Sequence, residues 1–328
     1  MKQDKFQHID QIFSISNHSE FEKMALIVFN FQYNNNPIYK QYCDYLKIDI
    51  RTIKSVKEIP FLPISFFKSH SIYIGNSKDD KTFTSSGTTG MTTSKHLVKD
   101  ILIYEQSFLK SFELFYGNIE DYVVLGLLPS YLEREGSSLI YMVDKLIELS
   151  KHSKSGFYLN EYEDLIEVIH SVKSTKKVIL FGVSYALLDL AEQFKPDLAG
   201  CIIIETGGMK GRRKEMPKYE LHNTLKMGLN VDNIHSEYGM TELLSQAYAT
   251  ENGQFKTPPF MKVLSREYND PFSYTKTKTG GLNIIDLANV YSCSFIATQD
   301  LGKIYPNYFE VLGRFDNSDI RGCNLLIQ

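Results

Sequence analysis

The chain has 328 residues, of which 43% are hydrophobic and 23% charged, and its formal net charge is −3. A chain of this length accommodates one large α/β domain or two smaller ones. The near-neutral charge argues against a protein that binds nucleic acid by neutralising phosphates, because no excess of Lys and Arg is available. Residues 1–14 do not fit a secretory signal, and no stretch of about 18 apolar residues indicates a membrane span.

The four cysteines lie far apart in the sequence and form no Cys-x-x-Cys pair. They are Cys43, Cys201, Cys293 and Cys323. This spacing fits neither a zinc site nor a small disulfide-stabilised scaffold. We therefore expect a cytoplasmic protein whose thiols are reduced.

The predicted elements begin with two helices between residues 21 and 46, where apolar residues recur at helical spacing. The polar run Asn-Asn-Asn-Pro at 34–37 separates them as a turn. The segment 59–63 contains two prolines, cannot continue a helix and is predicted to be extended. The helical N-terminal segment therefore covers about residues 1–58.

Beyond residue 122, short apolar runs alternate with helical patterns. The predicted strands cover 123–128, 178–182, 201–204 and 231–234, and the predicted helices cover 137–149, 185–194 and 217–228. Such alternation of buried, β-branched strands with helices is typical of parallel α/β layers. Between 281 and 312 the chain is rich in strands, with candidates at 282–285, 294–297 and 309–312, which indicates a small β subdomain.

The first segment with chemical potential is Thr-Ser-Ser-Gly-Thr-Thr-Gly at 84–90. Its glycines let the backbone approach a ligand closely, and consecutive N–H groups in such a turn can bind a phosphate. It is not a Walker motif, because no Gly-Lys-Ser/Thr ends it. A solvated surface loop of small residues is the alternative interpretation.

The second segment is Ser-Glu-Tyr-Gly-Met-Thr-Glu at 236–242, which follows the predicted strand 231–234. Open α/β sheets bind ligands at the carboxyl ends of their strands. Tyr238 offers a flat face for an adenine ring, Thr241 a donor for a phosphate and Glu242 a carboxylate for Mg²⁺. Alternatively, Thr241 caps a following helix and Glu242 faces the dipole of its first turn.

The third segment is Thr-Gln-Asp-Leu-Gly at 298–302, followed by Gly-Arg-Phe-Asp at 313–316. Asp300 at the end of a strand can accept hydrogen bonds from both hydroxyls of a ribose. The alternative is an ordinary turn, since Asp followed by Gly is common where a strand ends.

In this order and spacing, the three segments resemble the motif series of the acyl-adenylate-forming superfamily, which includes acyl-CoA synthetases, luciferases and peptide-synthetase adenylation domains. The resemblance runs from about residue 59 to the C-terminus. It implies an α/β fold of the adenylate-forming type, with layered α/β/α sheets and a small β subdomain over residues 1–312. A hinge and a short tail would follow at 313–328.

The resemblance also implies roles for individual residues, with ATP and Mg²⁺ as cofactors. The residues that would hold the ATP phosphates are Ser85, Ser86, Gly87, Thr88, Thr89 and Gly90. The adenine would lie along Gly207 and Gly208, with Tyr238 stacking on it. The ribose would contact Asp300, and Arg314 would reach the same nucleotide.

The catalytic residues implied by the resemblance are Thr241, which would contact the α-phosphate, and Glu242, which would bind Mg²⁺. The acyl pocket is less defined, and its candidates from position alone are Pro129, Tyr131 and Tyr185. Two departures stand out. The usual Gly-x-Pro-Lys does not continue the phosphate loop, so whether Lys95 replaces that lysine is open. The sequence stops at 328, so we expect the usual C-terminal lid domain to be lacking.

The run Ile-Arg-Gly-Cys-Asn at 320–324 resembles the start of the C-terminal domain in phenylacetate–CoA ligases, with Cys323 at a position that is usually apolar. A chain that stops there with a cysteine, and that carries Ser-x-His at 94–96, resembles the acyl-protein synthetases of the bacterial bioluminescence fatty-acid reductase complex. In that family the C-terminal cysteine carries the acyl group.

The sequence therefore predicts a ligase that activates a fatty or other apolar carboxylic acid as an acyl-adenylate. The acyl group would pass to Cys323, and then to a partner such as an acyl-accepting reductase or a carrier protein. Direct transfer to coenzyme A is one alternative, and a non-catalytic adenylate-binding protein is another. Cys323 as an inert residue near the terminus also remains open, because thiol reactivity depends on exposure and pKa.

Overall fold

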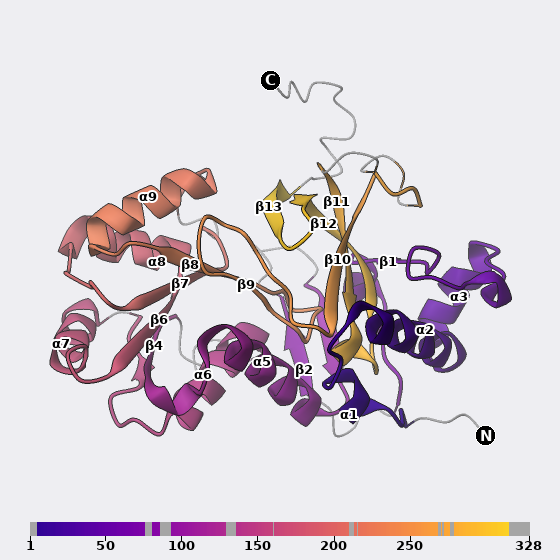
Figure 1. The fold of residues 1–328 in the computed structure, drawn as a ribbon, viewed down its shortest axis with the longest axis horizontal. Helices are drawn as coiled ribbons and strands as arrows, with labels where there is room; N and C mark the ends of the chain where they lie inside the picture. The colour runs from indigo at the N-terminus through magenta and orange to yellow at the C-terminus, as the bar shows by residue number, and fades with distance from the viewer. Residues whose placement is uncertain are drawn as a thin grey trace.

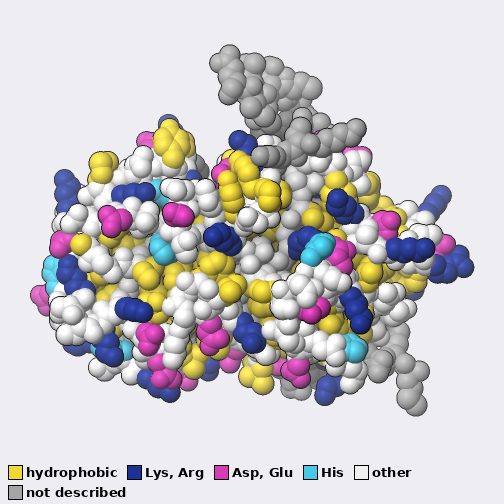
Figure 2. Space-filling view, viewed as in Figure 1, with side chains coloured by type: hydrophobic (Ala, Val, Ile, Leu, Met, Phe, Trp, Pro, Cys, Tyr) yellow, Lys and Arg dark blue, Asp and Glu magenta, His cyan; other side chains and the backbone are white. Residues whose placement is uncertain are grey.

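A computed structural model describes residues 5–75, 81–85, 93–128, 136–159, 161–209, 213–214, 216–267, 270, 272–275 and 279–314. Its two larger sheets lie side by side, each with its own helices, and a two-stranded sheet is separate from both (Figure 1). Basic and acidic side chains alternate over the visible face without a large patch of one sign (Figure 2), in line with the small net charge.

The N-terminal helices are α1 (Ile9–Ile12), α2 (His18–Asn35) and α3 (Pro37–Tyr45), followed by the short η1 (Ile50–Thr52). Asn36 separates α2 from α3, because its side chain accepts hydrogen bonds from the backbone N–H groups of Ile38 and Tyr39. Pro37 occupies the first helical position, where its missing N–H removes no helical hydrogen bond. The prediction of two helices joined by a turn is confirmed.

The next part of the chain holds elements that the sequence analysis did not predict, apart from the extended segment that contains β1 (Leu62–Pro63). They are α4 (Phe66–Ser69), β2 (Lys81–Thr84), β3 (Lys95–Val98) and α5 (Ile101–Tyr116). A helical signal was present in α5, since Tyr104, Phe108 and Phe112 are buried four residues apart. Strands β2 and β3 pair antiparallel, so the segment 85–94 connects the two strands of a hairpin.

The larger sheet has the strand order β5-β4-β6-β7-β8-β9. Its strands are β4 (Tyr122–Leu127), β5 (Gly156–Phe157), β6 (Lys177–Val183), β7 (Ile202–Thr206), β8 (Ile234–Tyr238) and β9 (Ala247–Ala249). All neighbouring pairs are parallel except β8 with β9. The predicted parallel α/β layer is therefore confirmed.

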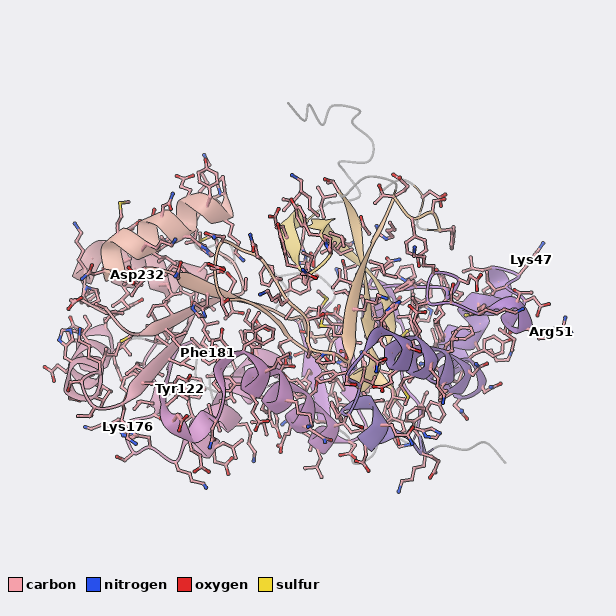
Figure 3. The ribbon with its side chains drawn as sticks, in the orientation of Figure 1. Lys47, Arg51, Tyr122, Lys176, Phe181 and Asp232 are labelled. Atoms are coloured by element: carbon pink, nitrogen blue, oxygen red, sulfur yellow. The ribbon has the colours of Figure 1, made fainter. Side chains whose placement is uncertain are left out.

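Helices alternate with the strands of this sheet and lie against it (Figure 1). They are η3 (Ile119–Asp121), α6 (Ser138–Ser150), α7 (Tyr162–Val172), α8 (Ser184–Asp189), its π-helical continuation η4 (Leu190–Phe194), and α9 (Lys218–Leu229). The central strand β6 is buried after its first residue, and Phe181 within it is 0% exposed. Figure 3 shows Phe181 inside this lobe, while Asp232 lies at its edge.

The smaller sheet has the order β1-β12-β11-β10, and β13 also pairs with β12. Its later elements are β10 (Met261–Arg266), β11 (Thr279–Asp286), η5 (Leu287–Asn289), β12 (Phe295–Ile304) and β13 (Phe309–Arg314). The ring of Phe295 packs against those of Phe29, Tyr39 and Phe61, so the N-terminal segment is part of the core around this sheet. The predicted β subdomain is confirmed, and it reaches further than expected.

Two predicted boundaries near the candidate site are wrong. Strand β8 begins at Ile234 and includes the motif residues Ser236 and Tyr238, whereas the analysis placed the strand at 231–234. Ser236 occurs inside a buried strand because its hydroxyl donates to the carboxylate of Glu205, so an apolar run alone did not reveal the strand. Asp300 lies within β12, which continues to Ile304 past a bulge, and not at the end of a strand.

None of the described helices combines the length and the hydropathy that a bilayer-spanning helix requires.

Candidate active site

The two sheets meet where Tyr238, the last residue of β8, contacts Asp300 in β12. The Tyr238 hydroxyl donates to Asp300 Oδ2 at 2.6 Å, and Arg314 Nε in β13 donates to Asp300 Oδ1 at 3.1 Å. Tyr238 and Asp300 are only 8% and 6% exposed. Burial, together with the neighbouring Asp300 carboxylate, raises the pKa of Tyr238 well above its ordinary value, so the phenol keeps its proton as a donor. Residues that are 62 positions apart thus form one polar group.

This polar group fits a ribose. A carboxylate has about four acceptor positions, and Tyr238 and Arg314 use two of them on Asp300, which leaves acceptor capacity for hydroxyl groups. The Tyr238 ring packs edge-on against Phe255 and Phe309, with centroids 5.8 and 5.5 Å away, which fixes the plane of the ring. The nucleotide roles of these residues remain predictions that the geometry accommodates.

Gly207 and Gly208 follow β7 in left-handed conformations, with φ of 81° and 72°. A side chain would be strained at either position, which accounts for glycine at both. A β-carbon added to Gly208 would meet no atom within 4 Å, so the space beside this backbone is open. Open space along the backbone at a strand end suits the predicted approach of a flat ring.

Thr241 and Glu242 lie in a turn directly after β8. The backbone N–H groups of Leu244 and Ser245 donate to Asp286 Oδ2 at 2.7 and 3.0 Å, and the Ser245 hydroxyl donates to Asp286 Oδ1 at 2.5 Å. No helix follows Thr241, so the alternative in which Thr241 is a helix cap is wrong. The backbone N–H groups after Glu242 find their acceptor in the buried carboxylate of Asp286 and not in a capping side chain.

The backbone of this turn is also held by His96 and Asn289. His96 Nδ1 lies 2.7 Å from the carbonyl oxygen of Thr241, and its Nε2 lies 2.9 Å from Asn289 Oδ1. Asn289 Nδ2 donates to the carbonyl oxygen of Glu242 at 2.7 Å. Burial lowers the pKa of His96 to about 4, and the two acceptors at its ring nitrogens oppose that shift.

Glu242 is 6% exposed, and burial raises the pKa of its carboxyl group. A hydrogen bond with Ser94 and the charges of Arg314 and Lys68 oppose the shift. A buried carboxylate beside the predicted phosphate site is the kind of ligand that Mg²⁺ takes, since this ion usually binds one or two carboxylates together with substrate phosphates. The residues present therefore fit a magnesium ion shared with a nucleotide.

Two further carboxylates, those of Glu205 and Glu237, lie near the ends of β7 and β8. Glu205 accepts from Ser184 and Ser236, and its Oε2 lies 3.3 Å from Lys218 Nζ. Although burial opposes it, Lys218 and hydrogen bonds to His222 and Ser184 lower the pKa of Glu205 to about 2.

The carboxylate of Glu237 has a different hydrogen-bond partner. It accepts from the Thr206 hydroxyl at 2.6 Å, and burial, with the nearby charge of Glu205, raises the pKa of its carboxyl group to about 7. Two neighbouring carboxylates thus have pKa values on opposite sides of the ordinary value, which is common at functional sites.

Sequence reasoning missed several residues of this site. Asp286 and Asn289 follow an apolar strand without any motif, and their only signal is the run Asp-Leu-Ala-Asn directly after four apolar or amide residues. His96 was noted only as part of a family marker, and Glu237 was not assigned a role. Each of them has a hydrogen-bond partner that lies more than 30 positions away in the sequence. A pattern of neighbouring residues does not reveal such contacts.

The outcome for the other predicted residues is as follows. Ser85 lies at the base of the hairpin connection, where Ser94 N–H donates to its hydroxyl at 2.9 Å. Lys95 is exposed at the start of β3, and Tyr185 is buried in α8. The predicted residues outside the described part of the chain are Ser86, Gly87, Thr88, Thr89, Gly90, Pro129, Tyr131 and Cys323.

Solved structures share this fold. The 2-hydroxyisobutyryl-CoA ligase in its postadenylation state superposes with a TM-score of 0.68 at 10% identity, covering 91% of this chain and 68% of that one. ATP-bound MatB from Rhodopseudomonas palustris superposes with a TM-score of 0.54 at 15% identity, covering 74% of this chain and 49% of MatB. This chain therefore spans about half the length of MatB. This chain therefore has the fold of the acyl-adenylate-forming ligases.

Sequence comparisons point to one group of ligases in particular. Residues 11–110 match the sequence profile of the family described as acyl-protein synthetase, LuxE. Over 334 aligned residues the chain is 22% identical to the long-chain-fatty-acid–luciferin-component ligase of Aliivibrio fischeri, covering 93% of this chain and 86% of that protein. The predicted resemblance to acyl-protein synthetases is confirmed, and with it the prediction of a ligase.

Proposed function

We propose that this protein joins a carboxylic acid to the AMP part of ATP, releasing pyrophosphate, and then passes the acyl group to a thiol. The observation that supports the proposal best is the hydrogen-bonded group of Tyr238, Asp300 and Arg314 next to the turn that carries Thr241 and Glu242. One part of it suits a nucleoside, and the other suits a phosphate with its metal ion. The fold shared with adenylate-forming ligases, one of them solved with ATP bound, supports the same conclusion.

In the first half-reaction, a carboxylate oxygen of the acid forms a bond to the α-phosphorus of ATP, and the bond to the pyrophosphate oxygen breaks. The chain contributes by holding the two reactants in line and by placing donors beside the charged phosphate oxygens. Asp300 and Tyr238 would fix the nucleoside, and the Thr241 hydroxyl would donate to the α-phosphate. Mg²⁺ bound at Glu242 would neutralise phosphate charge.

In the second half-reaction, a thiolate attacks the acyl carbon of the mixed anhydride, and AMP leaves. Thiolates are strong nucleophiles near neutral pH. The match to acyl-protein synthetases supports a thiol on the protein itself, and we assign it to Cys323. An acyl-accepting reductase or a carrier protein would then take the acyl group. The relative from Aliivibrio fischeri, by its name a long-chain-fatty-acid ligase, supports an apolar acid as the substrate.

ATP–pyrophosphate exchange tests the adenylation step directly. The protein is incubated with ATP, Mg²⁺, labelled pyrophosphate and, in turn, acetate, octanoate, tetradecanoate and phenylacetate. We expect label to enter ATP only when an acid is present, most rapidly with the longer fatty acids and without coenzyme A. If no acid of a wide panel supports exchange, the protein does not form adenylates. If acid-dependent exchange is followed by rapid CoA ester formation, the thiol belongs to coenzyme A.

A further inference from the structure

We propose that His96 is a positioning residue for adenylation, which joins the hairpin of the phosphate loop to the turn of Thr241 and Glu242. This inference rests on the proposed function, because it concerns how the two halves of the phosphate site keep their places. His96 is buried, and its polar contacts are with the backbone oxygen of Thr241 and the side chain of Asn289.

His96 lies in β3, two residues after the base of the hairpin connection. That base is closed by two hydrogen bonds, from Ser94 N–H to the Ser85 hydroxyl at 2.9 Å and from Ser85 N–H to the Ser94 carbonyl at 3.1 Å. A shift of β3 therefore moves both ends of the connection that carries the predicted phosphate loop. Through its Nδ1, His96 ties this strand to the carbonyl of Thr241, which is 145 positions away in the sequence.

The orientation of each partner of His96 is determined. Asn289 Nδ2 donates to the carbonyl oxygens of Glu242 and Cys293 at 2.7 and 3.0 Å, so its Oδ1 must be the atom that faces His96 Nε2. The Thr241 oxygen is a backbone carbonyl and can only accept, so Nδ1 of His96 carries the proton of the neutral ring that burial favours. Nε2 then has no proton, and its contact with Asn289 Oδ1 is a packing contact and not a hydrogen bond. Carbonyls of both residues of the turn are thus bound, one by His96 and the next by Asn289.

The far side of Asn289 is anchored as well. Gln32 in α2 donates through Nε2 to the carbonyl oxygens of Asn289 and Val290 at 3.0 and 2.9 Å. Gln32 is fully buried, so these bonds are shielded from water. Helix α2, the segment after β11 and strand β3 therefore hold the turn between them. A turn held from several elements keeps its side chains in place, which catalysis by positioning requires.

Two substitutions at His96 separate the hydrogen bond to Thr241 from the contact with Asn289. Asparagine places a side-chain N–H close to the position of Nδ1, so His96→Asn keeps a donor for Thr241. Glutamine places its amide near Nε2, so His96→Gln keeps a contact with Asn289 and loses the bond to Thr241. Phe67→Leu is a matched control, because the Phe67 ring packs edge-on against His96, with centroids 5.7 Å apart, and makes no hydrogen bond to it.

The full-length variants are compared in pyrophosphate exchange and in hydrogen–deuterium exchange of the backbone. For His96→Gln we expect a fall in kcat on the order of 30-fold, with the KM for ATP within about twofold, since Tyr238 and Asp300 are untouched. We expect His96→Asn to retain kcat within about fivefold. In His96→Gln, amides 241–245 should exchange roughly tenfold faster than in His96→Asn or Phe67→Leu.

If both His96 variants lose kcat equally, and if Phe67→Leu shows the same relation between lost kcat and lost stability, His96 is only a packing residue. Unchanged protection of amides 241–245 in His96→Gln would overturn the proposal whatever the kinetics show. If the wild type catalyses no exchange with any acid, the proposed function fails by itself. The amide protection then still decides whether His96 holds this turn.

Discussion

At the scale of single residues, the buried carboxylates of the site differ in what they are paired with. Glu205 has a lysine, a histidine and two hydroxyl groups around it, and its pKa is lowered. Glu242 is buried and Glu237 is partly buried, both with weaker compensation, and their pKa values are raised. A carboxylate whose charge is poorly compensated in the free protein destabilises the fold and is available to a cation or a donor from outside. Such an arrangement is expected where a ligand completes the site.

The first prediction concerns Glu242→Gln. We expect pyrophosphate exchange to fall by on the order of a hundredfold or more, because the carboxylate that would bind Mg²⁺ is lost. The folded protein should be at least as stable as the wild type, because a neutral amide avoids the cost of burying a charge. Kinetics of exchange and urea denaturation measure the two effects. Glu220→Gln on the exposed side of α9 is the control, and near-normal exchange in Glu242→Gln would refute the metal assignment.

The second prediction is a dependence of stability on pH that Glu237 causes. Its pKa in the folded chain is about 7, above the ordinary value of 4.5, so the native state holds a proton that the unfolded state releases. The free energy of unfolding should therefore fall as the pH rises from about 4.5 to about 7. Because the side chain is partly open to solvent, we expect a contribution on the order of 2 kcal/mol.

Urea denaturation of the wild type and Glu237→Gln at pH 5 and pH 8 measures this effect. Glutamine can still accept the hydrogen bond of Thr206, so only the titration is removed. The wild type should lose more stability than the variant between these pH values. Parallel losses in both proteins would show that Glu237 titrates at its ordinary pKa.

At the scale of elements, the turn at Asn36 connects the helical segment to the small sheet. Its side-chain oxygen caps α3, and its Nδ2 donates to the carbonyl oxygen of Ser292 at 2.9 Å. Asn36 is buried, while Asn17, which caps α2 by accepting from the Glu20 N–H at 3.0 Å, is exposed. An asparagine thus caps one helix in the interior and another at the surface. We expect the loss of stability on removing each cap to depend on its burial.

The third prediction compares these two caps. Asn17→Ala should lower the free energy of unfolding by about 1 kcal/mol, the usual cost of a lost cap. Asn36→Ala should cost roughly 2–4 kcal/mol, because it also leaves the Ser292 carbonyl buried without its donor. Chemical denaturation of both variants tests the difference. Equal costs would show that water replaces the lost donor at Ser292.

At the scale of the whole molecule, the candidate site is assembled across the junction of the two larger sheets. The proposed transfer to a thiol depends on which cysteine is available. Cys43, Cys201 and Cys293 are buried, and burial raises the pKa of Cys43 to about 12 and that of Cys201 to about 11. Burial also raises the pKa of Cys293. Cys43 lies in α3, Cys201 directly precedes β7, and Cys293 lies two residues before β12. Thiols of this kind stay protonated and are poor nucleophiles.

The fourth prediction follows from that comparison. With ATP, Mg²⁺ and a labelled fatty acid, the protein should acquire label that survives denaturation and is released by neutral hydroxylamine, as a thioester is. Cys323→Ser should catalyse pyrophosphate exchange at the wild-type rate and carry no hydroxylamine-sensitive label. Cys43→Ser is the matched control and should be labelled normally. Undiminished thioester in Cys323→Ser would place the acyl group on another residue.

Local patterns were sufficient for most of the α/β layer. Buried strands such as β4 and β6 are continuous apolar runs flanked by helical patterns, and these are properties of neighbouring residues. The same reasoning failed for β8, where Ser236 and Glu237 interrupt the apolar run, and for α5 and the β2–β3 hairpin, which were not predicted. The motif series indicated the resemblance to adenylate-forming ligases without any structure.

The sequence by itself therefore determined the alternation of strands and helices and the resemblance to acyl-protein synthetases, and it predicted the residues that would meet ATP. Only the tertiary structure decided how those residues are held: Tyr238 by Asp300, and the turn of Thr241 and Glu242 by Asp286, Asn289 and His96. The physical reason is that periodicity reports burial along one element. The hydrogen bond between His96 and Thr241, 145 positions apart, exists only once the β2–β3 hairpin has packed beside β8.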